Sequence, residues 1–481
     1  MSNFKRILAA VLAALTVLPF AACADGDDTP DDQTKHSQTT ASAEGESSFF
    51  PDIEKQDYNG ATFCMSGAKE DGSWYLAEEY KTGSDGNHVL NNTLFEMNTL
   101  VEEYLNIEFI MPSTAGVSLE TTIMSGDDIF QVHLPHAYWD VAPYISRNYV
   151  LDMNELENLD FSQPYWNGPI IDELAIADHR YVAVGDICWS VLHMIYTNKD
   201  LMENANLKMP YDKVRNGEWT FNEFYTLTSN LYQDDGDGQK NNKDLFGFAG
   251  GLNDWGAIIP QAAGIFVASK NEDGDFEVSL YNERLVNLFE DFETWTRNES
   301  VQVWTYGKSE GKEVDFKNQR CYVTGGILGT AYLGVDFEVG ILPMPKYDKD
   351  QENYSHVNWG HELLVPTTIK NPEMVGHVLE LMAFYSGTMV REKYYDEVLQ
   401  LRVSEQPEDR DMVEIIYNTV VYDPGMVYAH AGSNTGSLYP LSYTFHNCIG
   451  DGKNVTSYCQ GHLKPAQKQL DNLVKKVMNR S

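Results

Sequence analysis

From residue 58 onward the chain alternates between short strand-like runs and longer stretches with helical spacing, and this alternation limits the folds open to it. Residues 58–66 have the pattern of a strand, and residues 91–104 repeat apolar side chains at helical intervals. Residues 105–111 and 126–132 supply two more strand-like runs. A strand, a helix and a strand in this order are typical of parallel sheets covered by helices, so we predict an α/β fold.

The same alternation restarts after Pro164 and continues to the end of the chain. Strand-like runs lie at 180–184, 191–197, 320–328 and 337–342, and helical spacing marks 221–231, 285–296, 374–385, 412–419 and 466–478. Residues 272–275 form an acidic turn between two further strand-like pieces. A chain of this length exceeds what one hydrophobic core can serve, so two lobes are expected.

The N-terminus has the features of an export signal. Lys5 and Arg6 precede an apolar run, residues 7–18, that is too short to span a bilayer, which needs about 20 residues. Residues 20–23, Phe-Ala-Ala-Cys, resemble the lipobox of bacterial lipoproteins, although Phe20 stands where Leu is usual. The resemblance implies a signal peptide at 1–22 and lipidation of Cys23. The alternative is an ordinary cleaved signal followed by an incidental cysteine.

Residues 23–56 are rich in Asp, Thr, Ser, Gln and Glu and lack the apolar surface that would offset the entropy of ordering. We interpret them as a disordered tether after the lipidated cysteine. No later stretch is long and apolar enough to cross a membrane. The expected location is therefore the extracellular face of the cell membrane, held by the lipid anchor.

The charge balance and the cysteines narrow the choice of partners. Asp and Glu number 72 against 34 Lys and Arg, a net charge of −38, which disfavours nucleic acid because its binding needs cationic contacts to phosphate. Five cysteines remain beyond Cys23, an odd number that gives no complete disulfide framework. Cys448 and Cys459 are near enough in sequence for one bridge, and small buried thiols are the equal alternative.

Four short motifs follow one another along the chain. They are IYTNKDL at 195–201, GEWTFNEF at 217–224, VGILPMPK at 339–346 and NPE at 371–373 before an amphipathic stretch. In this order and spacing they resemble the bacterial extracellular solute-binding proteins of the large sugar-binding group. The resemblance covers most of the chain beyond the tether.

The resemblance implies a two-lobed periplasmic-binding-protein-like fold with a hinge and an interlobe ligand cleft. Lobe I is expected at 57–164 plus 304–366, and lobe II at 165–303 plus 367–481. The implied function is that of a substrate-binding lipoprotein of an ABC importer. Such a protein captures a sugar or oligosaccharide as a monomer, delivers it to separate permease subunits and is not an enzyme.

Candidate ligand-binding residues are aromatic side chains that can stack on sugar rings, together with polar neighbours that can bind hydroxyls. They are Trp74, His133, His136, Trp139, Asp186, Trp189, Asp254, Trp255, Trp359, His361 and Glu362. The choice of Trp255 and of the 133–139 loop rests on the resemblance, and the others follow strand-like runs or lie near an expected crossing between lobes. Packing in the core is the alternative for each, and Trp219 is assigned to packing at a helix entry.

The acidic loop at 233–244 resembles a Ca²⁺ loop of the D-x-D-x-D-G type. Asp235 and Asp237 fall at the third and fifth positions, Gln239 at the seventh and Asp244 at the twelfth. Gln233 occupies the first position, where Asp is usual. A structural Ca²⁺ is the only cofactor that the sequence suggests, and a solvated acidic turn is the alternative.

Other functions stay open at this point. The chain contains no G-x-G-x-x-G, no Walker loop and no H-E-x-x-H motif, and 72 acids prevent the choice of a glycosidase pair. A secreted carbohydrate-active enzyme, a binder of peptide or another polar solute, and a surface adhesin or sensor are the alternatives, because one fold serves many functions.

Overall fold

The computed structural model describes residues 50–66, 89–110, 119–135, 141–188, 191–305, 314, 316–327, 335–394, 407–431 and 436–480, all within the compact unit 50–481. The expected signal peptide, Cys23 and the tether up to residue 49 lie outside the described residues. So do four of the candidate ligand-binding residues, namely Trp74, His136, Trp139 and Trp189.

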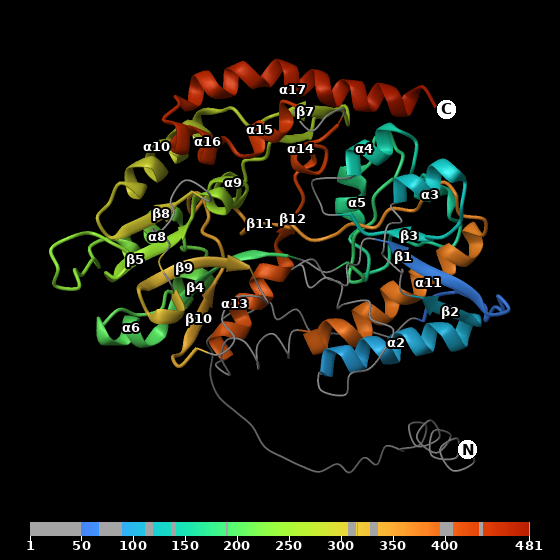
Figure 1. Ribbon diagram of the computed structural model, residues 1–481, viewed down its shortest axis with the longest axis horizontal. Coiled ribbons are helices and arrows are strands. Elements are labelled where there is room, and N and C mark those ends of the chain that lie inside the picture. The colour runs from blue at the N-terminus through green and yellow to red at the C-terminus, as the bar shows by residue number, and fades with distance from the viewer. Residues whose placement is uncertain are drawn as a thin grey trace, which may run out of the picture. The chain divides into compact units, whose positions relative to one another are not determined.

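The first three strands of the described chain form a three-stranded parallel sheet (Figure 1). Its strands are β1 (Ala61–Ser66), β2 (Ile107–Ile110) and β3 (Val132–His133), in the order β2-β1-β3. Helix α2 (Val89–Leu105) connects β1 to β2, and α3 (Leu119–Ser125) connects β2 to β3. This is the strand–helix–strand order that the sequence predicts, although the strand expected at 126–132 is only two residues long.

Two further segments pair at the edge of this sheet. His133 of β3 bridges to Leu364, and Leu363 bridges to Ala183, both in antiparallel sense. The segment 361–364 therefore runs between β3 and the segment 181–184. Residues 181–184, expected as a strand, form only isolated bridges.

A second, five-stranded mixed sheet has the order β10-β4-β9-β5-β8. Its strands are β4 (His193–Asn198), β5 (Phe246–Gly251), β8 (Val301–Trp304), β9 (Cys321–Ile327) and β10 (Val339–Leu342). Strand β4 is antiparallel to both of its neighbours, β10 and β9, whereas β5 is parallel to β8 and β9. β4 and β5 are buried along their whole length, and β5 is accordingly a continuous run of apolar and small residues.

The remaining elements cover these sheets or connect them. The helices are α4 (Val141–Ser146), α5 (Gly168–Leu174), α6 (Lys199–Asn204), α7 (Tyr211–Arg215), α8 (Phe221–Thr228), α9 (Leu252–Ala262), α10 (Glu283–Thr296), α11 (Pro372–Tyr385), α13 (Pro407–Asn418), α14 (Pro424–Val427), α15 (Leu438–Ser442), α16 (Thr444–Asp451) and α17 (Val455–Met478). The short elements are η1 (Met153–Glu155), η2 (Phe316–Asn318), the π-helical turn η3 (Ser386–Val390), the hairpin β6 (Ala268–Lys270) and β7 (Phe276–Val278), and the parallel pair β11 (His356–Val357) and β12 (Val420–Val421).

Helix starts follow from capping residues that the sequence already displays. The Thr220 side chain accepts a hydrogen bond from the backbone N–H of Glu223 at the start of α8, as expected for that helix entry. Asn371 caps α11, where Pro372 occupies a position that needs no N–H donor. Beside Thr220, the Trp219 indole is 1 % exposed and donates to the Pro343 carbonyl at 2.9 Å, which confirms its packing role.

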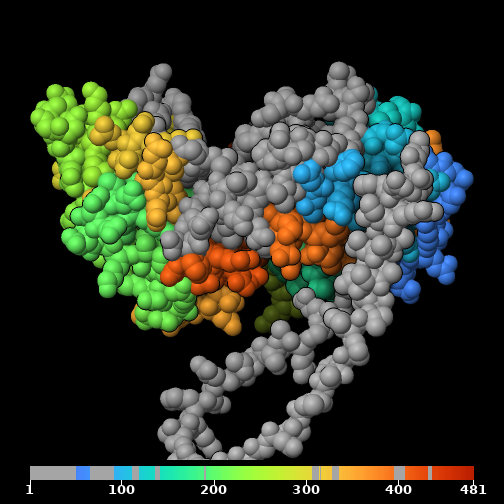
Figure 2. Space-filling model, turned by 90° about the horizontal axis from the view of Figure 1, so that it is seen from below, coloured from blue at the N-terminus to red at the C-terminus, as the bar shows by residue number. Residues whose placement is uncertain are grey.

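Helix α11 lies against α2 and not against the five-stranded sheet. The two helices are in contact, and the Tyr58 hydroxyl and His377 Nδ1 are 2.7 Å apart at the start of β1. Figure 2 shows α11 in orange beside α2 in light blue, and α13 in orange-red beside the green segment that holds α6 and α7. The expected division into lobes, which places 367–481 and therefore α11 in lobe II, stays a prediction.

Helix α17, the red helix in Figure 1, is the longest helix of the described residues. It contacts α4 near one end and α10, α15 and α16 elsewhere along its length. Within the described part of the chain, no helix combines the length and apolar character needed to span a bilayer.

Candidate ligand-binding site

A polar pocket of 390 Å³ lies where four segments from distant parts of the chain meet. The segments are 164–167, 184–188, 390–394 and 417–422. Its lining residues include Tyr165, Trp166, Asp186, Cys188, Arg391, Tyr394, Tyr417 and Tyr422. A concave site with several aromatic rings and a few fixed polar groups is the usual form of a small-molecule site. We call it the interior pocket below.

Asp186 and Arg391 form the charged part of the interior pocket. Arg391 Nη1 lies 3.1 Å and 3.4 Å from the two carboxylate oxygens of Asp186. Burial raises the pKa of Asp186, and the positive charge of Arg391 opposes that rise. The pair therefore presents a carboxylate that is fixed in position and only partly solvated, which suits the binding of hydroxyl donors.

A second carboxyl, Glu380 of α11, fixes two aromatic rings of the pocket wall. Its Oε1 accepts a hydrogen bond from the Tyr165 hydroxyl at 2.6 Å, and its Oε2 accepts one from the Trp166 indole N–H at 2.8 Å. Burial raises the pKa of Glu380, and the two hydrogen bonds oppose that rise. The rings are therefore held rigidly from behind.

The π-helical turn η3 brings Arg391 to the pocket. A Cβ atom added to Gly387 would lie 2.8 Å from Asp186 Oδ2 and 3.0 Å from Tyr165 Cβ, so only glycine permits this approach. Turns of this type are frequent at functional sites. Elsewhere in the lining Tyr394 and Tyr417 meet edge to face at 6.0 Å, and the Asn358 amide donates to the Tyr422 hydroxyl.

Several candidate residues lie together at one edge of the first sheet. His361 Nδ1 lies 2.7 Å from the Pro135 carbonyl oxygen, and the backbones of His133 and Leu364 exchange hydrogen bonds of 2.8 and 2.9 Å. Asp186 follows the segment that pairs with Leu363. The carboxyl ends of parallel strands form the edge at which open α/β sheets bind ligands. Of these candidates, Asp186 lines the interior pocket.

Glu362 lies fully inside the protein, next to the pocket wall. Its side chain is 0 % exposed, and neither carboxyl oxygen has a hydrogen-bond partner among the described residues. Burial raises the pKa of Glu362 well above its ordinary value, which favours the neutral acid. Its charge would raise the pKa values of Cys188 and Tyr422, which line the pocket.

Trp255 lies in the core of the second sheet, not in the lining of the interior pocket. It is 4 % exposed, stacks on Phe224 at 5.5 Å and meets Phe248 edge to face at 4.6 Å. The choice of Trp255 as a ligand-binding residue rests on the resemblance, and the structure has Asp254 and Trp255 in the first turn of α9. Asp254 is half-buried at that helix start.

Trp359 is also buried, and it packs against the start of β4. Its ring meets that of His193 edge to face at 4.4 Å, and its backbone N–H donates to the Val191 carbonyl at 3.0 Å. Burial lowers the pKa of His193 to about 3, so this imidazole is neutral. The structure therefore places Trp359 beside the second sheet, apart from Asp186 and the interior pocket.

Sequence reasoning missed most of the residues that line the interior pocket. Arg391 and Tyr394 follow the apolar helix 374–385, and Tyr165 and Trp166 follow Pro164, which the sequence marks only as a crossing point. The available signal was aromatic residues beside charged ones, in Pro-Tyr-Trp and in Arg-Glu-Lys-Tyr. Such combinations are common on helix surfaces and do not single out a site.

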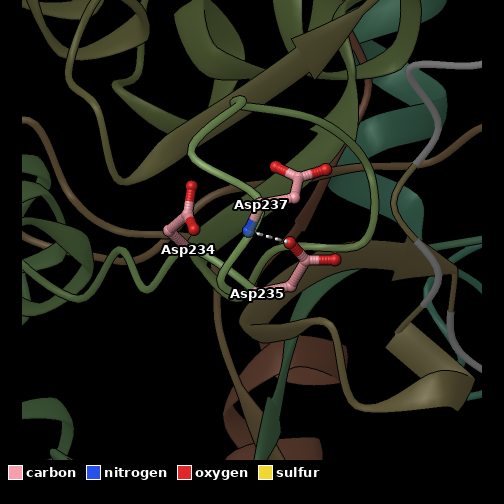
Figure 3. A group of neighbouring side chains, drawn as sticks. All are labelled: Asp234, Asp235 and Asp237. Atoms are coloured by element: carbon pink, nitrogen blue, oxygen red, sulfur yellow. Dashed lines mark hydrogen bonds between the residues drawn. The ribbon is translucent and has the colours of Figure 1, made fainter.

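The acidic loop brings three carboxylates together, in a different set from the expected one. Oxygen atoms of Asp234, Asp235 and Asp237 lie within 4.8 Å of one another, and all three residues are exposed (Figure 3). The backbone N–H of Asp237 donates to Asp235 Oδ1 at 3.1 Å.

The side chain of Asp244, the expected ligand at the twelfth position, is buried and accepts hydrogen bonds from its own loop. It is 0 % exposed and accepts hydrogen bonds from the backbone N–H groups of Asp235 and Asn241 at 3.0 and 2.8 Å, and from the Tyr232 hydroxyl at 2.8 Å. Burial raises the pKa of Asp244, but these hydrogen bonds outweigh it and the net pKa is lowered. Asp244 thus closes the loop from inside, and the Ca²⁺ site stays a prediction.

The five cysteines of the described residues are buried free thiols, including Cys448 and Cys459. Burial raises the pKa of Cys448 to about 12 and that of Cys459 to about 11, which keeps both as unreactive thiols. Of the two alternatives left open by the sequence, the structure contains the buried thiols.

No protein-family model matches the chain, and no curated protein matches it in sequence. Solved structures do match it over nearly their full length. A sugar transporter from Rhizobium etli, in an open conformation, matches with a TM-score of 0.57 at 12% identity, over 86% of this chain and 99% of that one. An ABC transporter solute-binding protein from Thermotoga lettingae bound with α-D-tagatose matches with a TM-score of 0.51 at 13% identity, over 86% and 100%.

UgpB from Mycobacterium tuberculosis, in complex with glycerophosphocholine, matches with a TM-score of 0.51 at 14% identity, over 86% of this chain and 99% of that one. The chain therefore has the two-lobed α/β fold of periplasmic-binding-protein-like solute-binding proteins, which confirms the predicted fold class. A structure described as a designed esterase also matches, with a TM-score of 0.56 at 12% identity. The fold alone does not decide between binding and catalysis.

Proposed function

We propose that the protein is the extracellular solute-binding component of an ABC importer and that its ligand is a sugar or oligosaccharide. It binds the ligand between its lobes, acts as a monomer and hands the ligand to separate permease subunits without chemical change. The observation that carries this proposal is the interior pocket, in which fixed aromatic rings and the Asp186–Arg391 pair face one space within a two-lobed fold.

The chemistry of the pocket suits a neutral polyhydroxylated ligand. Aromatic rings such as Tyr394 and Tyr417 offer faces on which the C–H side of a sugar ring can stack. The Asp186 carboxylate accepts hydroxyl protons and the Arg391 guanidinium donates to hydroxyl oxygens. Because the two charges offset each other, the pocket does not demand a charged ligand. The tagatose complex of a protein with this fold supports the same ligand class.

We further propose that Cys23 carries the lipid that holds the protein at the outer face of the cell membrane. The signal-like residues 1–22 and the polar stretch that follows them support this location. The absence of a spanning helix from the described residues is compatible with such an anchor.

The test is a thermal-unfolding screen of the purified protein against monosaccharides and oligosaccharides, followed by calorimetric titration of those that raise Tm. A ligand at about 100 times its Kd adds about 2.7 kcal/mol of stability. Asp186→Asn should weaken binding of that ligand by about tenfold or more, through loss of a charged hydrogen-bond acceptor. Asp350→Asn, which removes the same charge at an exposed position, is the matched control and should leave Kd unchanged.

The outcomes of the screen distinguish sugar binding from binding of another ligand class and from enzymatic cleavage. Stabilisation by one sugar class, with the sugar recovered intact, supports the proposal. Stabilisation by peptides or other polar solutes alone would show that the ligand belongs to another chemical class. Recovery of cleaved sugar would replace the binding function with that of a secreted carbohydrate-active enzyme.

A further inference from the structure

The C-terminal thirty residues have a charge opposite to that of the rest of the chain. Between Gly452 and Ser481 there are six Lys and Arg residues and one acid, Asp471, whereas the whole chain has a net charge of −38. Most of this segment is helix α17. Like charges that gather on one element of an oppositely charged protein mark a surface on which anions concentrate.

Three of these lysines line one groove of 610 Å³. Lys468, Lys475 and Lys476 face it together with Asn472 and Asn479. Their spacing of three and four residues puts them on one side of α17. The lining also includes Ser146 at the end of α4 and Ser437 before α15, and none of the described lining residues is acidic. We call this the α17 groove.

The lysines of the α17 groove are not neutralised by the protein itself. Lys468, Lys475 and Lys476 are exposed, and no carboxylate of the described residues lies within 4.0 Å of their ammonium groups. Lysines in the last turn stabilise a helix through its dipole, which accounts for Lys475 and Lys476 but not for Lys468, nor for a shared concave face.

The floor of the groove is held rigidly. Gln469 Nε2 donates to the Ala429 carbonyl at 2.9 Å, and its Oε1 accepts from the Leu438 N–H at 3.2 Å. A Cβ atom at Gly436 would lie 2.3 Å from the Gln469 amide, so the chain passes α17 at the closest approach that glycine allows. A groove fixed in this way needs no rearrangement to receive a ligand, which favours binding.

The lining chemistry points to phosphate groups. The described lining of the groove offers lysine ammonium groups, amides and hydroxyls. Lysine binds phosphate as a point charge that acts from many directions. The nine residues from Lys468 to Lys476 span about 12 Å of helix, which is longer than one phosphate group and matches two or more in sequence.

We propose that the α17 groove binds an extended chain of phosphate groups, such as a polyphosphate or a phosphodiester polymer, independently of the interior pocket. A concave site selects a chain over a flat lipid surface, because a bilayer cannot enter it. This site is separate in sequence and in lining from the residues proposed to bind sugar.

The test is fluorescence anisotropy of the purified protein with labelled linear polyphosphate, measured over a range of salt concentrations. Binding should weaken with salt at a log–log slope of about −2, as expected when two to three lysines each contact a phosphate. The variant K468Q/K475Q/K476Q should lose at least about tenfold in affinity. The matched control is K208Q/K243Q/K370Q, which removes three exposed lysines elsewhere and should change Kd by less than about twofold.

Four results would overturn the proposal. They are no polyphosphate binding at low salt, equal losses in the two triple variants, equal affinity for polyglutamate, and competition by single inorganic phosphate as effective per molecule as by the chain. Lysine-dependent binding to phosphatidylglycerol vesicles without binding of polyphosphate would also overturn it, since the helix would then be a membrane-facing surface. Circular dichroism of each variant separates loss of binding from loss of folding.

Discussion

At the scale of single residues, several buried carboxyl groups have different structural roles. Asp186 and Glu380 organise the interior pocket, Asp409 joins elements, and Asp423 fixes a turn. Each is stabilised by a different set of donors, so each responds differently to protonation or removal. The same residue type therefore yields distinct predictions according to what it contacts.

Asp423 should make stability depend on pH in a narrow window. Its carboxylate accepts hydrogen bonds from the N–H groups of Val267, Ala268 and Gly425, but burial raises the pKa of Asp423 from 3.8 to about 6. A raised folded-state pKa means that the folded protein holds the proton more tightly. The stabilising contribution is therefore complete below about pH 4 and is lost as the pH rises through about 6.

The variant Asp423→Asn removes the titrating group and tests this directly. The free energy of unfolding in urea, wild type minus variant, should fall between about pH 4 and about pH 6 and be level above that. The variant itself should be less stable near pH 4, because an amide cannot accept all three N–H groups. A difference that does not change with pH would contradict the raised pKa.

At the scale of elements, single residues decide how the turn η3 and the helix α13 contact the rest of the protein. η3 approaches Asp186 only because Gly387 has no side chain. Helix α13 is attached by Asp409, which is 0 % exposed and contacts groups of α6, α7 and β10. Substituting either residue should therefore disturb a whole element.

Gly387→Ala should weaken ligand binding. The new methyl group would lie 2.8 Å from Asp186 Oδ2, so the carboxylate or η3 must shift and the pocket loses its geometry. A fall in affinity of about tenfold is expected, measured by calorimetry with the sugar found in the screen. Gly461→Ala in α17 is the control, since its Cβ meets nothing within 4 Å and should stabilise the protein by about 0.5–1 kcal/mol. Unchanged affinity in Gly387→Ala would remove the interior pocket from consideration.

Asp409→Ala should be strongly destabilising. The Asp409 carboxylate pairs with Lys199 at 2.5 Å and accepts from the Tyr211 hydroxyl at 2.7 Å and the Ile341 N–H at 3.0 Å. Removing one partner of a buried pair costs about 3–5 kcal/mol. Asp411→Ala, on the same helix, breaks only an exposed pair with Arg215 and should cost about 0–1 kcal/mol. Equal effects in urea unfolding would show that Asp409 does not attach the helix.

The acidic loop gives a prediction for metal addition. If Asp234, Asp235 and Asp237 hold Ca²⁺, the ion should raise Tm and EGTA should reverse the change, because it relieves repulsion among three carboxylates. D235N/D237N should abolish this response. D273N/D275N removes two acids from another exposed turn and should leave it intact. Identical Tm values with and without Ca²⁺ would identify the loop as a solvated acidic turn.

At the scale of the whole molecule, net charge and fold determine how the protein interacts with other surfaces. The net charge of −38 keeps the body soluble and away from other anionic surfaces, while the basic face of α17 forms a local exception. Buried residues of the two sheets belong to one hydrophobic core, and α11, α13 and α17 join segments that are far apart in the sequence. The lipid anchor proposed at Cys23 would be what holds such a body at a membrane.

Cys23→Ser should therefore release the protein from membranes. In fractionated cells the wild type should be found with the membrane, and the variant in the medium or the soluble fraction, because a lipid anchor supplies most of the membrane affinity. Ala24→Ser, one residue further on, is the control and should stay with the membrane. Retention of Cys23→Ser on the membrane would mean that the segment acts as an ordinary signal or by another attachment.

The sequence by itself determined the order and kind of most elements. The strands expected at 58–66, 191–197, 320–328 and 337–342 correspond to β1, β4, β9 and β10, and the expected helices correspond to α2, α8, α10, α11, α13 and α17. This succeeds because period and capping are local properties of the chain. Helix α9 was missed, since Gly256 and Pro260 lower its helical signal.

Only the tertiary structure decided which residues share a site. Asp186 meets Arg391 across 205 residues, and Trp166 meets Glu380 across 214. No periodicity encodes such distant pairings, because they depend on how whole elements pack. The same reason explains Trp255, whose neighbours in sequence are polar but whose neighbours in space are Phe224 and Phe248. The chain therefore specifies its elements locally and its ligand site only through the packing of segments that are remote in sequence.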